Sequence, residues 1–431
     1  MEQTTTIAST PTLFVPEQIQ RMGMTVVDRC RACGEKIEAF MSLGQQPASQ
    51  VLVNPEERRD RFTYELKPAV CFRCCLLQLI EVPAPEFLFG ESYPYFTGTS
   101  QAMSEHFRQW AERLSAEFRD GQDPFVVEIG SNDGTFLHNM KRLGVRHLGV
   151  EPAASVVRVA REKGVNVLET FFNARTATQI RAQHGPADVI VAANVIAHIP
   201  AINEAAGGIS ILLSDGGIFT FEAIYLGDLV RNTVLDQLYD EHVFTFSVQS
   251  VHQVFGRFGL ELIDVEHQET HGGSIRYTLA HKGRHTVRKS VEKALEEEHA
   301  MRLYDPRTYE EFANRASFIR DRFVSLLRGL RAQGKRIAGY GATAKSTTIL
   351  NYCGIDSQLL DYIADNTPAK EGKATSGSHI IVRSPAYFAG DKPDYTVLLA
   401  WNHRQEIEQK EAAYREAGGK WIVYVPEVAV I

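Results

Sequence analysis

The sequence lacks several features that would place the chain outside the ordinary globular class. It has no uninterrupted run of about 18 apolar residues, and its first residues have neither a basic start nor an apolar signal-peptide core. Its formal net charge is −7 over 431 residues, without a long block of one sign, so nucleic-acid binding has no electrostatic support. We therefore expect a cytoplasmic protein whose partners include neither nucleic acid nor a membrane. No feature of the sequence assigns an oligomeric state, and a monomer is compatible with it.

Cysteine is scarce, with six in the whole chain, but five of the six lie between residues 26 and 85. In a reducing cytoplasm they are not expected to form disulfides. Cys30-x-x-Cys33 and Cys71-x-x-Cys74 each have the spacing that places two thiolates on one metal ion. Four thiolates around Zn²⁺ leave no open position, so we predict a structural zinc site, with Cys75 as an alternative to Cys74. Buried cysteines without a metal are the competing interpretation.

The length of the chain exceeds one compact core, since domains commonly use about 100–200 residues. Continuous apolar stretches alternate with helical patterns, which is typical of a parallel sheet covered on both faces. The predicted parts are a flexible tail at 1–22, a zinc-binding module at 23–90, an α/β domain at 91–285, linking helices at 286–334 and a smaller Rossmann-like domain at 335–431. Strands are predicted at 125–130, 147–151, 187–192 and 217–222, and then at 336–341, 359–365, 379–382, 395–401 and 421–426.

A glycine-rich turn follows the first of these strands and opens a helix, which brings the backbone close to a ligand. Its residues are Glu128, Gly130, Ser131, Asn132, Asp133 and Gly134. Glu151 ends the next strand, where an acid holds the ribose of a bound nucleotide. Asp133 would repel a pyrophosphate, whereas an uncharged nucleoside with a cationic tail suits the turn. The turn resembles the first motif of class I methyltransferases, and Glu151-Pro152 resembles their ribose-binding acid, which implies S-adenosylmethionine; a turn without a ligand is the alternative.

Polar clusters follow the later strands, at the edge where open α/β sheets bind ligands. They contain Asn194 and His198, then Tyr239, Glu241 and His242, then His271, Ser274 and Arg276. Together the segments 95–100, 128–134, 194–199, 239–242, 271–274 and 339–345 resemble, in this order, the sugar C-methyltransferases of deoxysugar biosynthesis. The resemblance covers nearly the whole chain. It implies a three-domain enzyme, of a kind found in antibiotic biosynthesis, that methylates C3 of a nucleotide-linked (dTDP) 4-keto-6-deoxy sugar with S-adenosylmethionine.

The residues fit that chemistry. A ring C–H beside a ketone needs a base within reach and a donor at the ketone oxygen as the enolate forms. We predict His242 as the base, because the ordinary pKa of histidine is near neutral. Tyr239 and Glu241 would orient it, hold the sugar or bind a water beside it. His198 is predicted to face the enolate oxygen, and Tyr95 to contact the donor or the sugar. The predicted donor site comprises Glu128, Gly130, Ser131, Asn132, Asp133, Gly134, Glu151, Pro152 and Asn194.

A second glycine-rich turn, residues 339–347, reads at first as another cofactor site. Its last residues are Lys345, Ser346 and Thr347 at a predicted helix N-terminus, and an ammonium, hydroxyls and backbone N–H groups suit a pyrophosphate. We predict that the acceptor supplies this pyrophosphate. The remaining candidates for acceptor binding are Ser274, Arg276, Asn351, Asp365, Asn366, His379 and Arg383. A turn that only shapes its domain is the alternative.

Three other functions compete with this interpretation. An O- or N-methyltransferase would share the donor site. An NAD-dependent dehydrogenase would use the C-terminal domain, where Gly339-x-Gly341-x-x-Ala344 fits the dinucleotide fingerprint and Asp365 closes the next strand. That domain has only about a hundred residues, which is small for a complete dehydrogenase. A sugar-nucleotide-binding protein without catalytic activity is the third possibility.

Overall fold

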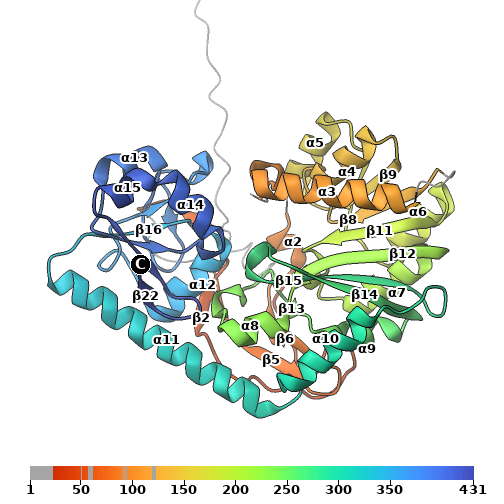
Figure 1. Ribbon diagram of the computed structural model, residues 1–431, viewed down its shortest axis with the longest axis horizontal. Helices are drawn as coiled ribbons and strands as arrows, with labels where there is room; N and C mark the ends of the chain where they lie inside the picture. The colour runs from red at the N-terminus through yellow and green to blue at the C-terminus, as the bar shows by residue number, and fades with distance from the viewer. Residues whose placement is uncertain (1–22, 50, 57–61, 91–92, 94, 119–122) are drawn as a thin grey trace, which may run out of the picture.

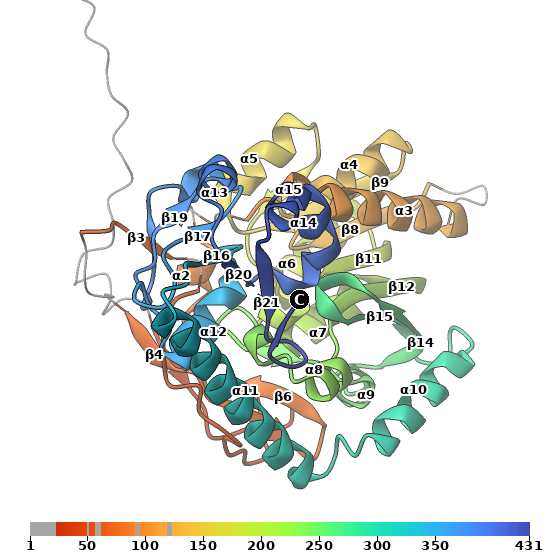
Figure 2. The same ribbon diagram turned by 60° about the vertical axis from the view of Figure 1, so that its left-hand side comes forward.

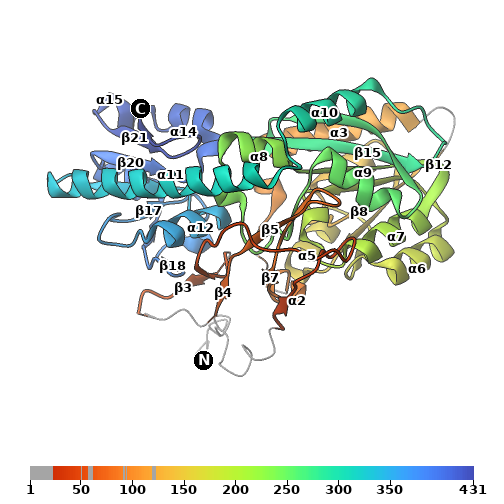
Figure 3. The ribbon, with the colours of Figure 1, turned by 90° about the horizontal axis from the view of Figure 1, so that it is seen from below.

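The computed structural model describes residues 23–49, 51–56, 62–90, 93, 95–118 and 123–431, so the predicted tail at 1–22 lies outside the described residues. Figure 1 shows two α/β units side by side, with one long helix running beneath the C-terminal unit toward the central unit. Seen from below in Figure 3, the strands of the N-terminal module lie alongside that helix, between the two units. None of the helices in the described ranges is long and apolar enough to cross a bilayer.

The central unit is built on a seven-stranded sheet. Its strands are β8 (Phe125–Ile129), β9 (Arg146–Glu151), β10 (Val167–Glu169), β11 (Ala187–Ala193), β12 (Leu213–Ile224), β14 (Leu260–Gln268) and β15 (Ser274–His281). Their order is β10-β9-β8-β11-β12-β15-β14. Strands β8 to β12 pair in parallel as predicted, but β15 runs antiparallel to both neighbours. The sequence analysis missed β14 and β15 because charged residues such as Asp264 and Arg276 interrupt their apolar pattern.

Helices cover both faces of this sheet (Figure 1). They are α3 (Gln101–Phe118), α4 (Thr135–Arg142), α5 (Ala154–Glu162), α6 (Ala174–His184), α7 (Ile202–Leu212), α8 (Leu226–Asn232) and α9 (Val248–Gly256), with 3₁₀ turns η1 (Thr97–Thr99), η2 (Ile196–His198), η3 (Leu235–Gln237) and η4 (Thr270–Gly272). Helix α3 buries Phe107, Trp110 and Leu114 on one face, which agrees with the helical period of its sequence. The sheet is therefore buried on both sides, and ligands can reach it only at its edges.

The N-terminal module consists of short strands and turns. Its elements are β1 (Thr25–Val26), β2 (Gln45–Pro47), β3 (Leu52–Val53), β4 (Thr63–Glu65), β5 (Pro68–Cys71), β6 (Leu76–Leu79), β7 (Glu81–Val82) and α2 (Pro85–Leu88). A strand from the central unit, β13 (Phe244–Thr245), pairs with β6 and completes a three-stranded sheet, β13-β6-β5. The N-terminal module and the segment that follows His242 therefore share one sheet.

The C-terminal unit has a six-stranded mixed sheet in the order β19-β17-β16-β20-β21-β22, with β22 antiparallel to β21. Its elements are β16 (Ile337–Tyr340), β17 (Ile363–Ala364), β18 (Ala374–Thr375), β19 (Val382–Arg383), β20 (Tyr395–Leu398), β21 (Lys420–Val423), β22 (Ala429–Val430), α12 (Ala344–Cys353), α13 (Pro385–Asp391), α14 (Arg404–Lys410), α15 (Ala412–Glu416), η5 (Pro368–Lys370) and η6 (Trp401–His403). The parallel strands on either side of β16 agree with the predicted Rossmann-like pattern.

Two linking helices, α10 (Lys289–Ala300) and α11 (Pro306–Ala332), connect the units, as Figure 2 shows for α11 beside the N-terminal strands. The N-terminal module also contacts the C-terminal unit directly, because β3 pairs with β18. One continuous cluster of buried apolar side chains includes Leu77, Phe246 and Leu350 and so runs through all three parts. The parts therefore share a core, and their relative positions are fixed by packing.

Candidate active site

The first glycine-rich turn lies at the carboxyl end of β8 and approaches the turn after β11 closely. Gly130 has a φ of +68°, and a Cβ there would lie 2.5 Å from Cγ2 of Val195. Glu151, at the end of β9, accepts hydrogen bonds from the backbone N–H of Asn132 at 3.0 Å and of Ala153 at 3.0 Å. The turn and the predicted ribose-binding acid are therefore one connected structure, as the spacing indicated.

Two buried polar atoms at this turn have no hydrogen-bond partner within the described part of the chain. They are Oε2 of Glu128 and Oγ of Ser131. Burial raises the pKa of Glu128 well above its usual value, and the charges of Asp133 and Glu151 add to this. Buried polar atoms rarely stay unpaired, so this turn offers what a polar ligand such as S-adenosylmethionine would satisfy.

The side chains of Asn132 and Asp133, both predicted donor contacts, bind the segment before α3. Oδ1 of Asn132 accepts from the N–H of Thr97 at 3.0 Å, and Oδ2 of Asp133 accepts from the N–H of Gly98 at 3.0 Å. The ammonium of Lys163 lies 3.1 Å from Asp133. These side chains hold the segment before α3 over the first glycine-rich turn, residues 128–134, which is called the donor turn below. The carboxylate of Asp133 is balanced by a cation, so the argument that it repels phosphate does not hold.

Tyr95 lies in the segment that this contact fixes. Its carbonyl oxygen accepts from Nδ2 of Asn132 at 3.1 Å, and its side chain is 40% exposed. Burial of the hydroxyl end and the nearby charge of Asp133 raise the pKa of Tyr95. The phenol is therefore protonated near neutral pH and can donate a hydrogen bond to a ligand in the donor turn.

His242 is held in a defined protonation state. Its Nδ1 lies 2.8 Å from the carbonyl oxygen of Gln237, and its Nε2 lies 2.9 Å from the hydroxyl of Tyr239. A carbonyl oxygen only accepts, so Nδ1 carries the proton and Nε2 accepts from the phenol. Burial, with a smaller contribution from His198, lowers the pKa of His242 well below its usual value. His242 is thus a neutral imidazole with its lone pair on Nε2.

His198 lies directly beside this ring. The two imidazoles stack with centroids 5.3 Å apart, and Phe89 stacks on His198 at 5.5 Å. Burial lowers the pKa of His198 to about 3, and its Nε2 has no hydrogen-bond partner among the residues described. The structure therefore brings together the predicted base and the predicted contact to the ketone oxygen.

A third histidine, His271, joins this cluster without having been assigned a role from the sequence. Its carbonyl oxygen accepts from Nε2 of Gln237 at 2.8 Å. Burial and the charge of Lys345 lower the pKa of His271 to about 4. Glu241, on the other side, is buried and lies 3.5 Å from the hydroxyl of Tyr93. The site therefore contains three neutral imidazoles, and the charge of Lys345 lowers the pKa of two of them, His242 and His271.

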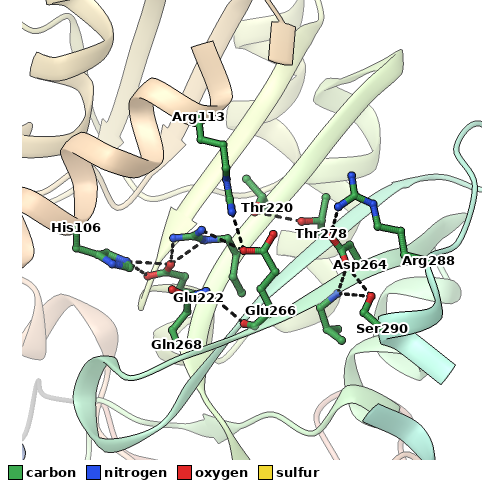
Figure 4. Close-up of polar contacts among 12 residues, drawn as sticks. His106, Arg113, Thr220, Glu222, Asp264, Glu266, Gln268, Thr278, Arg288 and Ser290 are labelled. Atoms are coloured by element: carbon green, nitrogen blue, oxygen red, sulfur yellow. Dashed lines mark hydrogen bonds and ion pairs between the residues drawn. The ribbon is translucent and has the colours of Figure 1, made fainter. Parts of the chain in front are cut away.

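The guanidinium of Arg276, a predicted acceptor contact, is bound within the protein. Its Nε donates to Oε1 of Glu222 at 2.8 Å, and the guanidinium lies over the ring of Trp110 at 4.2 Å. Nε2 of His106 lies 2.8 Å from Oε2 of Glu222, and Figure 4 shows this cluster with Glu266 beside it. Burial alone would raise the pKa of Glu222, but the bond from His106 and the charge of Arg276 lower it.

Glu222 lies at the carboxyl edge of the sheet, since it pairs with Ala193 at the end of β11. The sequence contains no local signal for its role, because its partners come from α3 and β15. Ser274, another predicted acceptor contact, is also engaged within the protein: its hydroxyl donates to the carbonyl oxygen of Thr270 at 3.0 Å.

The second glycine-rich turn places Lys345 against the same site. Its ammonium lies 4.5 Å from the ring centroid of Trp401 and donates to Oδ1 of Asn402. Burial lowers the pKa of Lys345 to about 8, while the charge of Asp236 acts in the opposite direction. The charge of Lys345 is also one of the smaller causes that lower the pKa of His242.

The neighbouring hydroxyls are taken by protein acceptors. Oγ of Ser346 donates to the carbonyl oxygen of Thr343 at 2.6 Å, and Oγ1 of Thr347 donates to that of Ser49 at 3.1 Å. Asn351 donates to the carbonyl oxygen of Thr347 at 2.8 Å. Of the three side chains predicted to contact the pyrophosphate, Lys345 is the one whose described hydrogen bonds leave N–H donors for a ligand.

The other predicted acceptor residues lie around the C-terminal sheet. Asp365 accepts from the N–H of Ala342 at 2.9 Å and so holds the glycine-rich turn in place. Asn366 is exposed, and Arg383 lies over the ring of Tyr387 at 5.1 Å. His379 has a φ of +50° in the loop after β18.

The two units meet at Asp236, which the sequence analysis did not identify. Its Oδ2 accepts from Nε1 of Trp401 at 2.7 Å and from the hydroxyl of Tyr424 at 2.6 Å. Burial raises the pKa of Asp236. At Gly272, which has a φ of +89°, a Cβ would overlap the ring of Trp401. The C-terminal unit therefore forms one wall of the site that contains His242.

The four predicted zinc ligands come together. Sγ atoms of Cys30, Cys33, Cys71 and Cys74 all lie within 4.8 Å of one another. Cys75 is outside this group; its N–H donates to the carbonyl oxygen of Cys71 at 2.7 Å and so closes the second knuckle. Nε2 of Gln78 donates to Sγ of Cys30 at 3.1 Å. The structure selects Cys74 as the fourth ligand, and the closed set fits a structural Zn²⁺.

Comparison with known proteins agrees with this division. The sequence matches three family models, which describe a zinc binding domain over residues 30–89, a methyltransferase domain over 101–265 and a C-methyltransferase C-terminal domain over 269–426. It is 36% identical over 408 residues to C-methyltransferase NovU of Streptomyces niveus, which covers 94% of this chain and 97% of that protein.

Solved structures resemble the central unit more distantly. A SAM-dependent methyltransferase from Anabaena variabilis is 14% identical, covers 42% of this chain and 95% of its own, and has a TM-score of 0.32. The CcbJ methyltransferase from Streptomyces caelestis is 16% identical, covers 41% of this chain and 89% of its own, and has a TM-score of 0.31. These likenesses are too distant to support any argument about the site.

Proposed function

We propose, from the premise that this chain belongs to the C-methyltransferase family and is an S-adenosylmethionine-dependent enzyme with a four-cysteine zinc site, that its acceptor is a nucleotide-linked 4-keto-6-deoxy sugar methylated at C3. Family membership removes the dehydrogenase, the binding protein without activity and the O- or N-methyltransferase from consideration. What remains to be proposed is the acceptor and the role of each residue.

The observation that carries the proposal is the state of His242. A base that removes a proton beside a ketone must be neutral and must keep a lone pair directed at the site. The bond from Nδ1 to the carbonyl oxygen of Gln237 fixes this tautomer, and Tyr239 holds Nε2 until the acceptor arrives. Nε2 would then take the C3 proton, and the phenol would turn to the sugar.

The enolate oxygen needs a hydrogen-bond donor or a positive charge. His198 supplies an unpaired Nε2 beside His242, and its low pKa keeps it neutral, so it acts as a donor in the tautomer that carries the proton on Nε2. The ammonium of Lys345 adds a positive field from the C-terminal side. Together these groups stabilise negative charge in a site largely closed to water.

The donor turn would hold the methyl group opposite this base. S-adenosylmethionine supplies a sulfonium-bound methyl group that a carbon nucleophile can attack. Glu151 would bind the ribose hydroxyls, Glu128 and Ser131 would pair with the polar tail, and Gly130 allows the close approach of the backbone. Tyr95 lies at the rim of this turn and can contact either ligand. Catalysis by this chain is then mainly orientation and exclusion of water.

The acceptor's pyrophosphate would lie at the N-terminus of α12, beside Lys345. The helix begins at Ala344, and the ammonium is buried against Trp401 rather than dispersed in solvent. Backbone N–H groups at a helix start and a lysine form a favourable anion site. Because Lys345 lies on the ring of Trp401, which bonds to Asp236 in the segment that carries His242, the sugar attached to that pyrophosphate would lie toward the base.

Proton exchange tests the proposal without the methyl donor. The enzyme is incubated in deuterium oxide with dTDP-4-keto-6-deoxyglucose, and loss of the C3 proton is followed by NMR. We expect exchange with the wild type and none with His242→Asn, whereas His281→Asn should keep it. His281 is a matched control because its ring also lies near a carbonyl oxygen, that of Leu213, but at the opposite end of the sheet. Wild-type exchange by His242→Asn would refute the assignment of the base.

A further inference from the structure

The catalytic segment of the central unit, residues 236–245, is held from outside that unit. At its start, Asp236 is bound by Trp401 and Tyr424 of the C-terminal unit. At its end, β13 pairs with β6 of the N-terminal module. Within it, the carbonyl oxygen of Leu238 accepts from the hydroxyl of Thr348 at 3.0 Å. The predicted base therefore depends on two other domains for its position.

Asp240 makes the central contact in this segment. It is fully buried, and both carboxylate oxygens are bound by one residue of the N-terminal module: Oδ2 by the N–H of Ser49 at 3.0 Å and Oδ1 by its hydroxyl at 2.5 Å. Oδ1 also accepts from the N–H of Glu241 at 3.1 Å. Hydrogen bonds to a charged, buried acceptor are among the strongest in proteins. Asp240 is adjacent to Glu241 and two residues from His242.

Ser49 also contacts the helix proposed to receive the acceptor. Its carbonyl oxygen accepts from Oγ1 of Thr347, two residues after Lys345 on α12. One residue, itself 7% exposed, thus joins the catalytic segment to α12 through its side chain, N–H and C=O. A buried polar network whose members are all paired fixes the relative position of the segments that it joins.

We propose that Ser49 is a positioning residue of the reaction, which fixes Asp240, and through it Glu241 and His242, relative to the N-terminus of α12. This rests on the proposed role of His242 as the base. Ser49 touches neither donor nor acceptor in this account. It aligns the base with an acceptor whose pyrophosphate is bound by another domain. A displacement of the base by about 1 Å can cost roughly 100-fold in rate.

The same interface offers a matched control. The hydroxyl of Ser376, in the C-terminal unit, donates to the carbonyl oxygen of Val51 at 2.7 Å. This bond also joins the N-terminal module to the C-terminal unit, and Ser376 is itself buried, but the bond does not involve the catalytic segment. If Ser49 only holds the domains together, Ser49→Ala and Ser376→Ala should have the same consequences.

The test compares Ser49→Ala, Ser49→Thr and Ser376→Ala in the full chain, with donor affinity measured by calorimetry and acceptor kinetics measured with dTDP-4-keto-6-deoxyglucose. We expect Ser49→Ala to lower kcat and the rate of C3 exchange by about 10- to 100-fold, with donor Kd and acceptor KM changed by less than about threefold. Ser49→Thr keeps a hydroxyl and should recover most of the loss. Ser376→Ala should keep wild-type kcat.

Two results would overturn the proposal: wild-type kcat in Ser49→Ala, or an equal loss of kcat in Ser376→Ala. Asp240→Asn provides a second variant of unchanged size if Ser49→Ala does not fold, and unchanged kcat in it would also refute the proposal. Exchange by His242→Asn separates the two claims. If that variant still exchanges the proton, the proposed base is wrong; if it does not and Ser49→Ala does at the normal rate, only the positioning role is wrong.

Discussion

Removal of the Lys345 ammonium should weaken the acceptor and leave the donor unaffected. Lys345 is buried, stacked on Trp401 and bonded to Asn402, so solvent does not screen its charge. A hydrogen bond to a charged group is worth about 1.5–3 kcal/mol, so Lys345→Met should lower kcat/KM for the acceptor roughly 10- to 150-fold. The upper part of this range is expected, because Asp236 also loses its opposing charge.

The pH dependence gives a second view of the same group. Burial lowers the pKa of Lys345 to about 8, so its charge is present below that pH and is lost above it. In the wild type, kcat/KM for the acceptor should therefore fall above pH 8, by about tenfold at pH 9. The low pKa values of His198, about 3, and His271, about 4, give no acid limb above pH 5.

The assay is steady-state kinetics with varied acceptor and saturating donor between pH 6 and 9.5, with donor Kd from calorimetry. Lys345→Arg keeps the charge at every pH and should remove the alkaline limb. Lys163→Met is the contrasting variant: Lys163 pairs with Asp133 at the donor turn, so it should weaken the donor and spare the acceptor. Unchanged acceptor kinetics in Lys345→Met, or a weakened donor, would refute the division between the two turns.

Two further outcomes concern stability. Cys74→Ser should lose bound zinc, measured by plasma mass spectrometry, and unfold at lower temperature, whereas Cys75→Ser should retain the metal because its thiol lies outside the cluster; equal zinc loss in both would contradict the ligand assignment. Glu222→Gln leaves the buried guanidinium of Arg276 without its buried charge partner and should cost about 3–5 kcal/mol in urea unfolding. Glu266→Gln, at a partly exposed partner, should cost less than about 1 kcal/mol, and an equal loss would remove the distinction.

The contacts that the sequence spacing predicted join residues that are close along the chain. The two cysteines of each pair are three positions apart, and a knuckle of that length forms locally whatever surrounds it. The glycine-rich turn and Glu151 belong to one βαβ unit, and Tyr239 and His242 are three residues apart. In each case the chain between the residues is too short to allow many other arrangements.

What the sequence did not predict depends on long-range pairing. Ser49 and Asp240 are 191 residues apart, and Asp236 and Trp401 are 165 apart, so no spacing rule connects them. Arg276 is a residue type that often binds ligands, but here its guanidinium bonds to Glu222 on the neighbouring strand. A polar residue near a site can bind a ligand or a protein neighbour, and only the tertiary structure distinguishes the two.

The most direct test of the account is the structure of the product. Purified enzyme is incubated with S-adenosylmethionine carrying a ¹³C-labelled methyl group and with dTDP-4-keto-6-deoxyglucose, and the product is examined by mass spectrometry and carbon-correlated NMR. The account expects a gain of one methyl group, with the labelled carbon bonded to C3 of the sugar. A label on a hydroxyl oxygen, or no transfer to any member of a panel of nucleotide-linked keto sugars, would contradict it.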